Sequence, residues 1–240
     1  MSKSATTPVI WAVIPAAGIG KRMQSEIPKQ YLPLAGSTVI ENTITRLLSS
    51  DKVTGLAIAL RQDDQYWPGI RITSDKPVIR AEGGAERCDS VLSALQTLAD
   101  QEGFDIDNDW VLVHDAVRPC VRLDDIDALV EQATVSEAGG LLALPVRDTM
   151  KRAGEGQVVQ ATVDREGLWH ALTPQLFPYR ALREALTKAM QEGVVVTDES
   201  SAMEFAGYAP KLVEGHEHNI KITRPNDLGL AELFLADQLN

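Results

Sequence analysis

The sequence predicts an α/β fold in which a mostly parallel β-sheet carries helices on both faces. Two observations lead to this prediction. Apolar runs of strand length alternate along the chain with segments of helical period, and the strand candidates are apolar throughout rather than on alternate residues. Continuous apolar strands are typical of parallel sheets covered on both sides. A third observation, the loss of this pattern between residues 148 and 168, predicts an additional element outside the sheet.

The first three elements follow from local sequence. Val9–Ile14 is an uninterrupted apolar run, which predicts a buried strand. Ser37–Leu48 has helical period, and Thr38 and Glu41 are spaced as a capping box at its start. Val53–Leu60 is a second apolar run and predicts the next strand.

The same alternation continues through the middle of the chain. Val78–Arg80 predicts a short strand, and the apolar residues of Asp89–Ala99 fall on one face of a helix. Trp110–His114 predicts a strand, Leu123–Ser136 a helix and Leu141–Val146 another strand. We therefore expect a Rossmann-like, mostly parallel sheet.

Residues 148–168 have no helical period. Polar and β-branched residues flank a turn that contains Gly154 and Gly156, which predicts an antiparallel hairpin projecting from the sheet. A lone two-stranded hairpin is marginally stable in water, so we expect it to pack on a second copy of itself. The simplest organisation is one domain over residues 1–240 with an arm at about 148–168.

The remaining residues return to the alternating pattern. Helical period predicts helices at Tyr179–Gln191 and Asn226–Leu239, with short strands near Lys211–Glu214 and Asn219–Ile222 between them.

Composition excludes several classes of partner. The chain has 23 Lys and Arg against 34 Asp and Glu, a net charge of −11, so we expect no nucleic-acid or anionic-membrane binding. Its apolar runs are too short to span a bilayer. Two cysteines, Cys88 and Cys120, cannot form a disulfide framework. These features predict a cytoplasmic protein.

The connection after the first strand, Pro15–Met23, is the most informative segment. It is rich in glycine and alanine, which let backbone N–H groups approach a phosphate closely. Three cations, Lys21, Arg22 and Lys29, fall within nine positions. The segment is neither a P-loop nor a dinucleotide fingerprint, because the required Lys-Ser/Thr pair is missing and Met23 replaces a small residue. An ordinary glycine turn with solvated cations remains the alternative.

Two further strand ends carry candidate site residues. Gly84 permits close backbone approach, and Ser90 lies at a helix N-terminus, where ordinary capping is the alternative. Asp115 directly follows an apolar strand and needs a cation or Mg²⁺ as a partner. A salt bridge to Arg118 is the alternative for Asp115, and His114 is expected to be a core residue.

Five strings together resemble a known enzyme family. They are Pro15–Met23 with Pro28–Gln30, Gly83–Arg87, His114–Pro119, Ala171–Gln175 and Asn219–Pro225. The first resembles the signature loop of sugar-phosphate nucleotidyltransferases. In this order and spacing, the five resemble the 2-C-methyl-D-erythritol 4-phosphate cytidylyltransferases of the non-mevalonate isoprenoid pathway, from about Val9 to Leu239.

The resemblance implies roles for individual residues. The CTP-binding residues would be Pro15, Ala16, Ala17, Gly18, Gly20, Arg22, Lys29, Gly84, Ser90 and Lys221. The acceptor-binding residues would be Asp115, Arg118, Thr149, Arg165, Thr197 and Lys221. Arg22 and Lys29 would stabilise the transition state at the α-phosphate, and Lys221 would reach both substrates. Arg165 would enter the partner subunit's site from the arm, so the implied assembly is a homodimer.

The implied reaction joins CTP and methylerythritol phosphate and releases pyrophosphate, with Mg²⁺ on the phosphates and its protein ligands unknown. The attacking group is a phosphate, which is mostly dianionic at pH 7 because its second pKa is about 6, so no general base is required. One alternative is a cytidylyltransferase for ribitol 5-phosphate or another polyol phosphate. A second is a non-catalytic nucleotide-binding module, which would not need Lys221 or Arg165.

Overall fold

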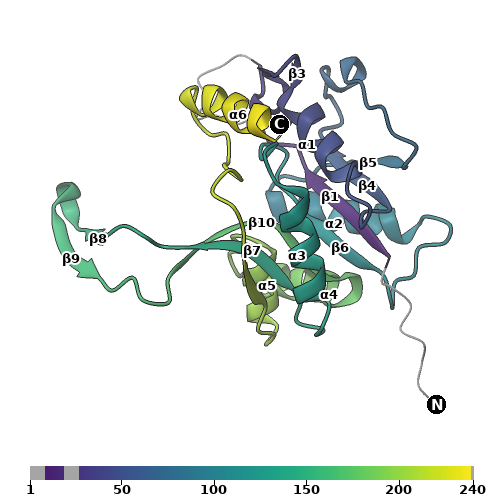
Figure 1. Ribbon diagram of the computed structural model, residues 1–240. Helices are drawn as coiled ribbons and strands as arrows, with labels where there is room; N and C mark the ends of the chain where they lie inside the picture. Colours follow the sequence, from purple (N-terminus) through teal and green to yellow (C-terminus); the bar gives the residue numbers. More distant parts are fainter. Residues whose placement is uncertain (1–8, 19–26, 239–240) are drawn as a thin grey trace.

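A computed structural model describes residues 9–18 and 27–238, and its centre is a seven-stranded sheet (Figure 1). The strands lie in the order β11-β7-β10-β6-β1-β4-β5. Their bounds are β1 Ile10–Pro15, β4 Gly55–Leu60, β5 Val78–Glu82, β6 Trp110–Val113, β7 Gly140–Pro145, β10 Trp169–Pro178 and β11 Lys211–Glu214. Only β10 runs antiparallel to its neighbours, β6 and β7. The predicted mostly parallel sheet is confirmed.

Helices cover both faces of the sheet. They are α1 Val39–Leu48, α2 Arg87–Ala99, α3 Leu123–Ala133, α4 Tyr179–Gln191, α5 Glu199–Phe205 and α6 Asn226–Asp237. Helices α1 and α3 pack on one face, and α2, α4 and α5 pack on the other. The predicted capping box starts α1: Glu41 N donates to Thr38 Oγ1 at 3.3 Å and Thr38 N donates to Glu41 Oε2 at 2.8 Å.

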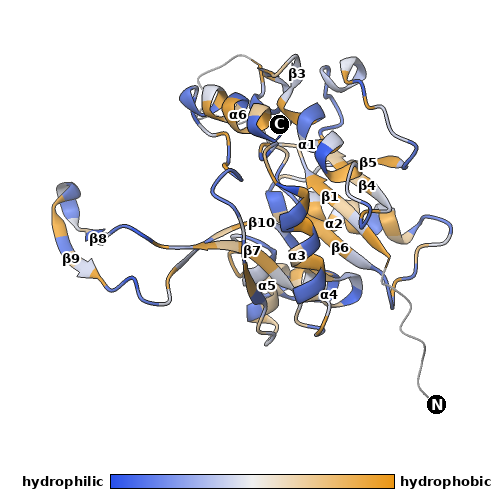
Figure 2. Cartoon of the chain, viewed as in Figure 1, coloured by the Kyte–Doolittle hydropathy of each residue, from blue (hydrophilic) through white to orange (hydrophobic). Residues whose placement is uncertain are grey.

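Strand β4 shows why the strand candidates lack a polar face. Leu56, Ile58 and Leu60 belong to the apolar cluster on the face that α1 and α3 cover, and Ala57 and Ala59 belong to the cluster on the face that α2 covers. All five are fully buried. Each buried Leu or Ile contributes roughly 1.5–3 kcal/mol to folding. Figure 2 shows the apolar strands enclosed by helices whose outer surfaces are hydrophilic.

One strand of the main sheet and one of its covering helices were not predicted from sequence. Strand β10 contains Pro174, and its pairing with β7 shifts register between Ala171 and Gln175. The proline and the polar residues around it break the apolar run by which strands are recognised. Helix α5 has only seven residues, too few for helical period to be detected.

The strand expected at Asn219–Ile222 is wrong. This segment forms no strand, and Ile222 N donates to the carbonyl of Val117 at 2.9 Å. The shorter elements are a two-stranded pair, β2 Pro33–Leu34 and β3 Ser37–Thr38, and 3₁₀ turns at Lys29–Tyr31, Trp67–Gly69 and Glu155–Gln157.

The predicted hairpin is present. Strands β8, Met150–Ala153, and β9, Val159–Val163, pair antiparallel around a turn in which Gly156 has φ +67°. Figure 1 shows this pair standing away from the sheet at the end of two extended segments. Nearly all of its residues are exposed. Among the described residues, no helix is both long and apolar enough to cross a membrane.

Candidate active site

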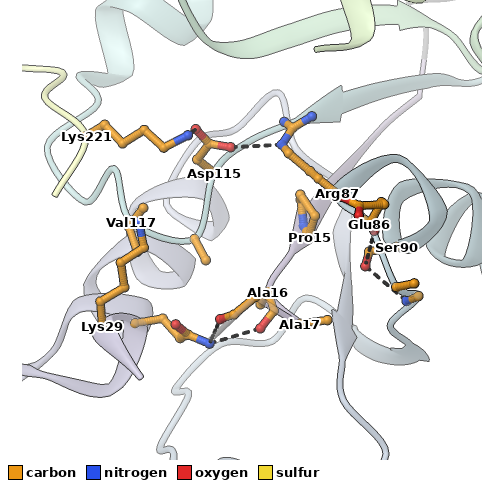
Figure 3. A pocket seen from close by; sticks show the side chains of 15 residues that line it. Pro15, Ala16, Ala17, Lys29, Glu86, Arg87, Ser90, Asp115, Val117 and Lys221 are labelled. Atoms are coloured by element: carbon orange, nitrogen blue, oxygen red, sulfur yellow. Dashed lines mark hydrogen bonds and ion pairs between the residues drawn. The ribbon is translucent and has the colours of Figure 1, made fainter. Parts of the chain in front are cut away.

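A cavity of about 270 Å³ lies beyond the carboxyl ends of β1, β5 and β6 (Figure 3). Ligands of open α/β sheets bind at this edge. The structure brings together there nine of the residues singled out from the sequence. They are Pro15, Ala16, Ala17, Gly18, Lys29, Gly84, Ser90, Asp115 and Lys221.

The loop after β1 is fixed from two sides. Ala16 N donates to the carbonyl of Ala59 at 2.8 Å. The side-chain amide of Gln30 donates to the carbonyls of Ala16 and Gly18, at 3.0 and 3.2 Å. Gln30 is buried, and sequence analysis gave it no role although it ends the string Pro28–Gln30. It holds the loop open around the cavity.

The loop after β5 is shaped by Ser90. Gly84 N donates to Ser90 Oγ at 3.1 Å, and this hydroxyl donates to the carbonyl of Glu86 at 3.2 Å. A Cβ on Gly84 would lie 2.1 Å from the Cβ of Asp89, so only glycine fits. Asp89 with Glu86 forms the capping box of α2. Ser90 therefore organises the Gly84 loop and does not cap the helix itself.

Asp115 is the centre of an ion-pair cluster. Its Oδ1 lies 3.2 Å from Arg87 Nε, and its Oδ2 lies 2.8 Å from Lys221 Nζ and 3.4 Å from Arg118 Nε. Figure 3 shows Lys221 and Arg87 reaching this carboxylate from opposite sides. Burial alone would raise the pKa of Asp115, but Arg87, Lys221 and Arg118 outweigh it and hold the pKa well below its usual value. The pair with Arg118 is confirmed, although it is one of three.

Arg87 also pairs with Glu199 at the start of α5. Its Nη1 and Nη2 donate to the two oxygens of Glu199, at 2.6 and 3.0 Å. The Glu199 side chain is only 1% exposed. The sequence alone predicts no role for Arg87 or Glu199. Arg87 ends one of the five strings, whereas Glu199 lies in a short helix that carries no pattern.

A second layer of hydrogen bonds fixes the segment that carries Lys221. Arg118 Nη1 donates to the carbonyl of Asn219 at 2.7 Å, and Asn219 Nδ2 donates to the carbonyl of Thr173 at 2.7 Å. His114 Nε2 donates to the carbonyl of Arg118 at 2.9 Å, and Thr173 Oγ1 donates to His114 Nδ1 at 3.0 Å. Arg118 thus lies behind the cavity. His114 is the core residue expected, and burial lowers its pKa to about 4.

Lys29 lines the cavity from the 3₁₀ turn that follows the signature loop. Its Nζ donates to the carbonyl of Ile222 at 3.3 Å, which links that turn to the segment carrying Lys221. Two lysines therefore reach one cavity from segments almost two hundred residues apart.

The structure does not place every predicted residue in this cavity. Thr149 and Arg165 are exposed on the arm, and Thr197 is exposed just before α5. Gly20 and Arg22 lie outside the described residues. Within residues 9–18 and 27–238, no three His, Cys, Asp or Glu side chains are grouped so as to hold a metal ion.

Comparison with known proteins identifies the family. The family described as 2-C-methyl-D-erythritol 4-phosphate cytidylyltransferase matches residues 10–237. The chain belongs to this family. A 2-C-methyl-D-erythritol 4-phosphate cytidylyltransferase of Vibrio vulnificus (strain YJ016) is 52% identical over 236 residues, covering 98% of each chain. The resemblance drawn from the five strings is confirmed.

Solved structures of cytidylyltransferases from this family share the fold. The crystal structure of a 4-diphosphocytidyl-2C-methyl-D-erythritol synthase has a TM-score of 0.80 at 35% identity, covering 96% of this chain and 100% of that chain. The enzyme of Francisella tularensis has a TM-score of 0.79 at 35% identity, covering 94% and 99%. All residues that line the cavity lie within the part of the chain that matches the cytidylyltransferase family.

Proposed function

We propose that this chain transfers the cytidylyl group of CTP to 2-C-methyl-D-erythritol 4-phosphate and releases pyrophosphate, in isoprenoid precursor biosynthesis. Similarity to cytidylyltransferases over nearly the whole chain supports this function. The single observation that carries it is that Lys29 and Lys221 reach one cavity at the carboxyl edge of the sheet, beside a glycine loop. Two cations and open backbone N–H groups suit a reaction between two polyanions.

The nucleotide occupies the side of the cavity formed by the loops after β1 and β5. The backbone of Ala16, Ala17 and Gly18 contacts the phosphates, because side chains this small leave the N–H groups accessible. Gly84 and Ser90 receive the cytosine and ribose. Among the described residues, a Cβ added at Gly18 would meet no atom within 4 Å, which suits a backbone that a ligand approaches.

The acceptor phosphate attacks the α-phosphate of CTP in line with the departing pyrophosphate. A phosphomonoester is mostly dianionic at pH 7, so the described residues need supply no general base. The barrier is the repulsion between two polyanions and the charge that develops on the α-phosphate. Lys29 with Arg22 stabilises this charge, and Lys221 contacts both substrates. Fixed cations in such a site are worth about 10²–10³ in rate each.

The arm completes the acceptor site in a homodimer. Four of the large apolar side chains exposed on or beside it are Met150, Val158, Val159 and Leu168, and the exposed fraction of Val158 is 68%. An isolated hairpin that exposes such side chains needs a partner surface. We propose that Arg165 and Thr149 of one subunit reach the acceptor side of the other subunit's cavity, which Asp115 lines, with Arg118 behind it and Thr197 exposed before α5.

A divalent cation, Mg²⁺, enters with CTP. Both oxygens of Asp115 already face cations, so this carboxylate does not fit a metal, and no other described group offers a site. The nucleotide phosphates are therefore the ligands that we propose for Mg²⁺. Cys88 and Cys120 are free thiols, which suits the cytoplasm.

Pyrophosphate release by the purified protein tests this function. CTP and Mg²⁺ are supplied with methylerythritol phosphate, with ribitol 5-phosphate or without an acceptor. We expect release only with methylerythritol phosphate. Release with ribitol 5-phosphate alone would assign a different acceptor to the same cavity. Binding of CTP with no release in any arm would instead indicate a nucleotide-binding module.

A further inference from the structure

The ion pairs around Asp115 form one cluster of five charged side chains. Its cations are Arg87, Arg118 and Lys221, and its carboxylates are Asp115 and Glu199. The described part of this cluster therefore carries one positive charge in excess. The Glu199 side chain is the most buried member at 1% exposure, Asp115 and Arg118 are each 9% exposed, and Lys221 is 38% exposed.

A buried carboxylate without a cation is strongly unfavourable. Arg87 donates hydrogen bonds from its two terminal nitrogens to both carboxylate oxygens of Glu199. Its Nε also donates to Oδ1 of Asp115. Arg118 contacts Oδ2 of Asp115. The two guanidinium groups thus equal the two carboxylates in charge, and Lys221, which lies 2.8 Å from Oδ2 of Asp115 and is the most exposed member, adds the third positive charge.

We propose that Arg87 is a positioning residue: by neutralising Glu199 and sharing Asp115, it leaves the ammonium of Lys221 available to an anionic substrate. Without Arg87, Glu199 would lose its ion-pair partner among the described residues, and Asp115 would be left with Arg118 and Lys221 beside an unbalanced buried carboxylate. Lys221 would then be held by buried charge and could not transfer its interaction to a phosphate. This inference rests on the proposed role of Lys221 as a substrate ligand.

The position of Arg87 also connects the two halves of the cavity. It is the first residue of α2, next to the loop of Gly84, and Glu199 is the first residue of α5, two positions after Thr197. One guanidinium therefore fixes the nucleotide side against the acceptor side. Arg87 lines the cavity as well, so direct contact with substrate is the competing explanation.

A double-mutant cycle separates the two explanations. Arg87→Gln alone removes the surplus charge, and we expect the affinity for inorganic pyrophosphate, measured by calorimetry, to fall roughly tenfold or more. Arg87→Gln combined with Glu199→Gln restores the surplus. We expect this double variant, whose net charge equals that of the wild-type cluster, to bind pyrophosphate within about threefold of the wild type. In steady-state turnover, the acceptor KM of Arg87→Gln should rise by a larger factor than its kcat falls. In the double variant, the acceptor KM should return towards the wild-type value.

The matched control is Arg122→Gln, which removes an arginine from an exposed pair with Asp124 and should change neither readout. A double variant that binds no better than Arg87→Gln would show that Arg87 itself contacts the anion and would overturn the proposal. The proposal would also be overturned if the loss of pyrophosphate binding in Arg87→Gln matched the loss of folded protein measured by thermal unfolding. Pyrophosphate binding needs no turnover, so its result is independent of whether the proposed acceptor is correct.

Discussion

The backbone nitrogen of Gly84 donates a hydrogen bond to the hydroxyl of Ser90 at 3.1 Å. This contact folds the loop after β5 back onto the first turn of α2, and it is possible only because Gly84 has no side chain. Gly18 lines the same cavity, and no atom of the described residues lies within 4 Å of a Cβ added there. We therefore expect the two glycines to serve different purposes, Gly84 for folding and Gly18 for ligand access.

Alanine at these two glycines should separate stability from CTP binding. Gly84→Ala puts a Cβ 2.1 Å from that of Asp89, so the loop or the helix must move. We expect a loss of about 1–3 kcal/mol in the free energy of unfolding, together with a higher CTP KM. Gly18→Ala should change stability by less than about 0.5 kcal/mol. It should still raise the CTP KM, because the new methyl group occupies ligand space.

Urea unfolding and steady-state kinetics on both variants provide the measurement. Equal stability of Gly84→Ala and the wild type would contradict the tight contact. An unchanged CTP KM in Gly18→Ala would show that the nucleotide does not approach this loop.

The buried His114 should make the protein less stable in mild acid. Its folded-state pKa of about 4 lies below the unfolded value of 6.5, so the folded protein favours the neutral imidazole. Its contribution is fully present above pH 6.5 and is lost as the pH falls towards 4. The loss amounts to roughly 3 kcal/mol in the free energy of unfolding.

Urea unfolding at several values between pH 7 and pH 4 measures this loss. In His114→Gln the titrating group is absent, and the amide can still donate to the carbonyl of Arg118. We therefore expect a lower stability at pH 7 but a flatter dependence on pH. Parallel curves for the variant and the wild type would mean that His114 does not dominate this range.

Mixing two inactive variants tests whether the arm acts between subunits. Arg165→Ala lacks the proposed arm residue, and Lys29→Ala lacks a cavity residue. A mixed dimer would rebuild one intact site from the Lys29 of one subunit and the Arg165 of the other. Random subunit exchange should restore about a quarter of the wild-type activity. No recovery, despite exchange shown by mass spectrometry of the mixture, would place Arg165 outside the partner's site.

Much of the fold could be predicted from the sequence because its strands are apolar throughout. Strands such as β1 and β4 are buried on both faces, and each is an uninterrupted run. Strand β10 was not predicted because Thr173, Pro174 and Gln175 interrupt it. The two polar side chains have structural roles. Thr173 forms hydrogen bonds with Asp115 and His114, and Gln175 accepts one from Ser200 in α5.

The candidate site was only partly predictable. Glycines and clustered cations near Pro15 and Gly84 are visible as short strings, so this part of the cavity lining could be predicted. Arg87 and Glu199 were missed because their pairing joins segments more than a hundred residues apart. No local pattern marks such a pair. Gln30 was missed for a similar reason, since its role is to bond two backbone carbonyls.

The central claim is that the cavity cations at the carboxyl edge of the sheet drive cytidylyl transfer. Its most direct test is kcat for pyrophosphate release by Lys29→Ala, Lys221→Ala and Arg22→Ala. Lys52→Ala is the matched control, because Lys52 is exposed in the turn before β4, at the opposite edge of the sheet. We predict that the three site variants lose at least about 10²-fold in kcat while remaining folded, and that Lys52→Ala keeps the wild-type rate. Wild-type turnover by folded Lys29→Ala and Lys221→Ala proteins would contradict the account.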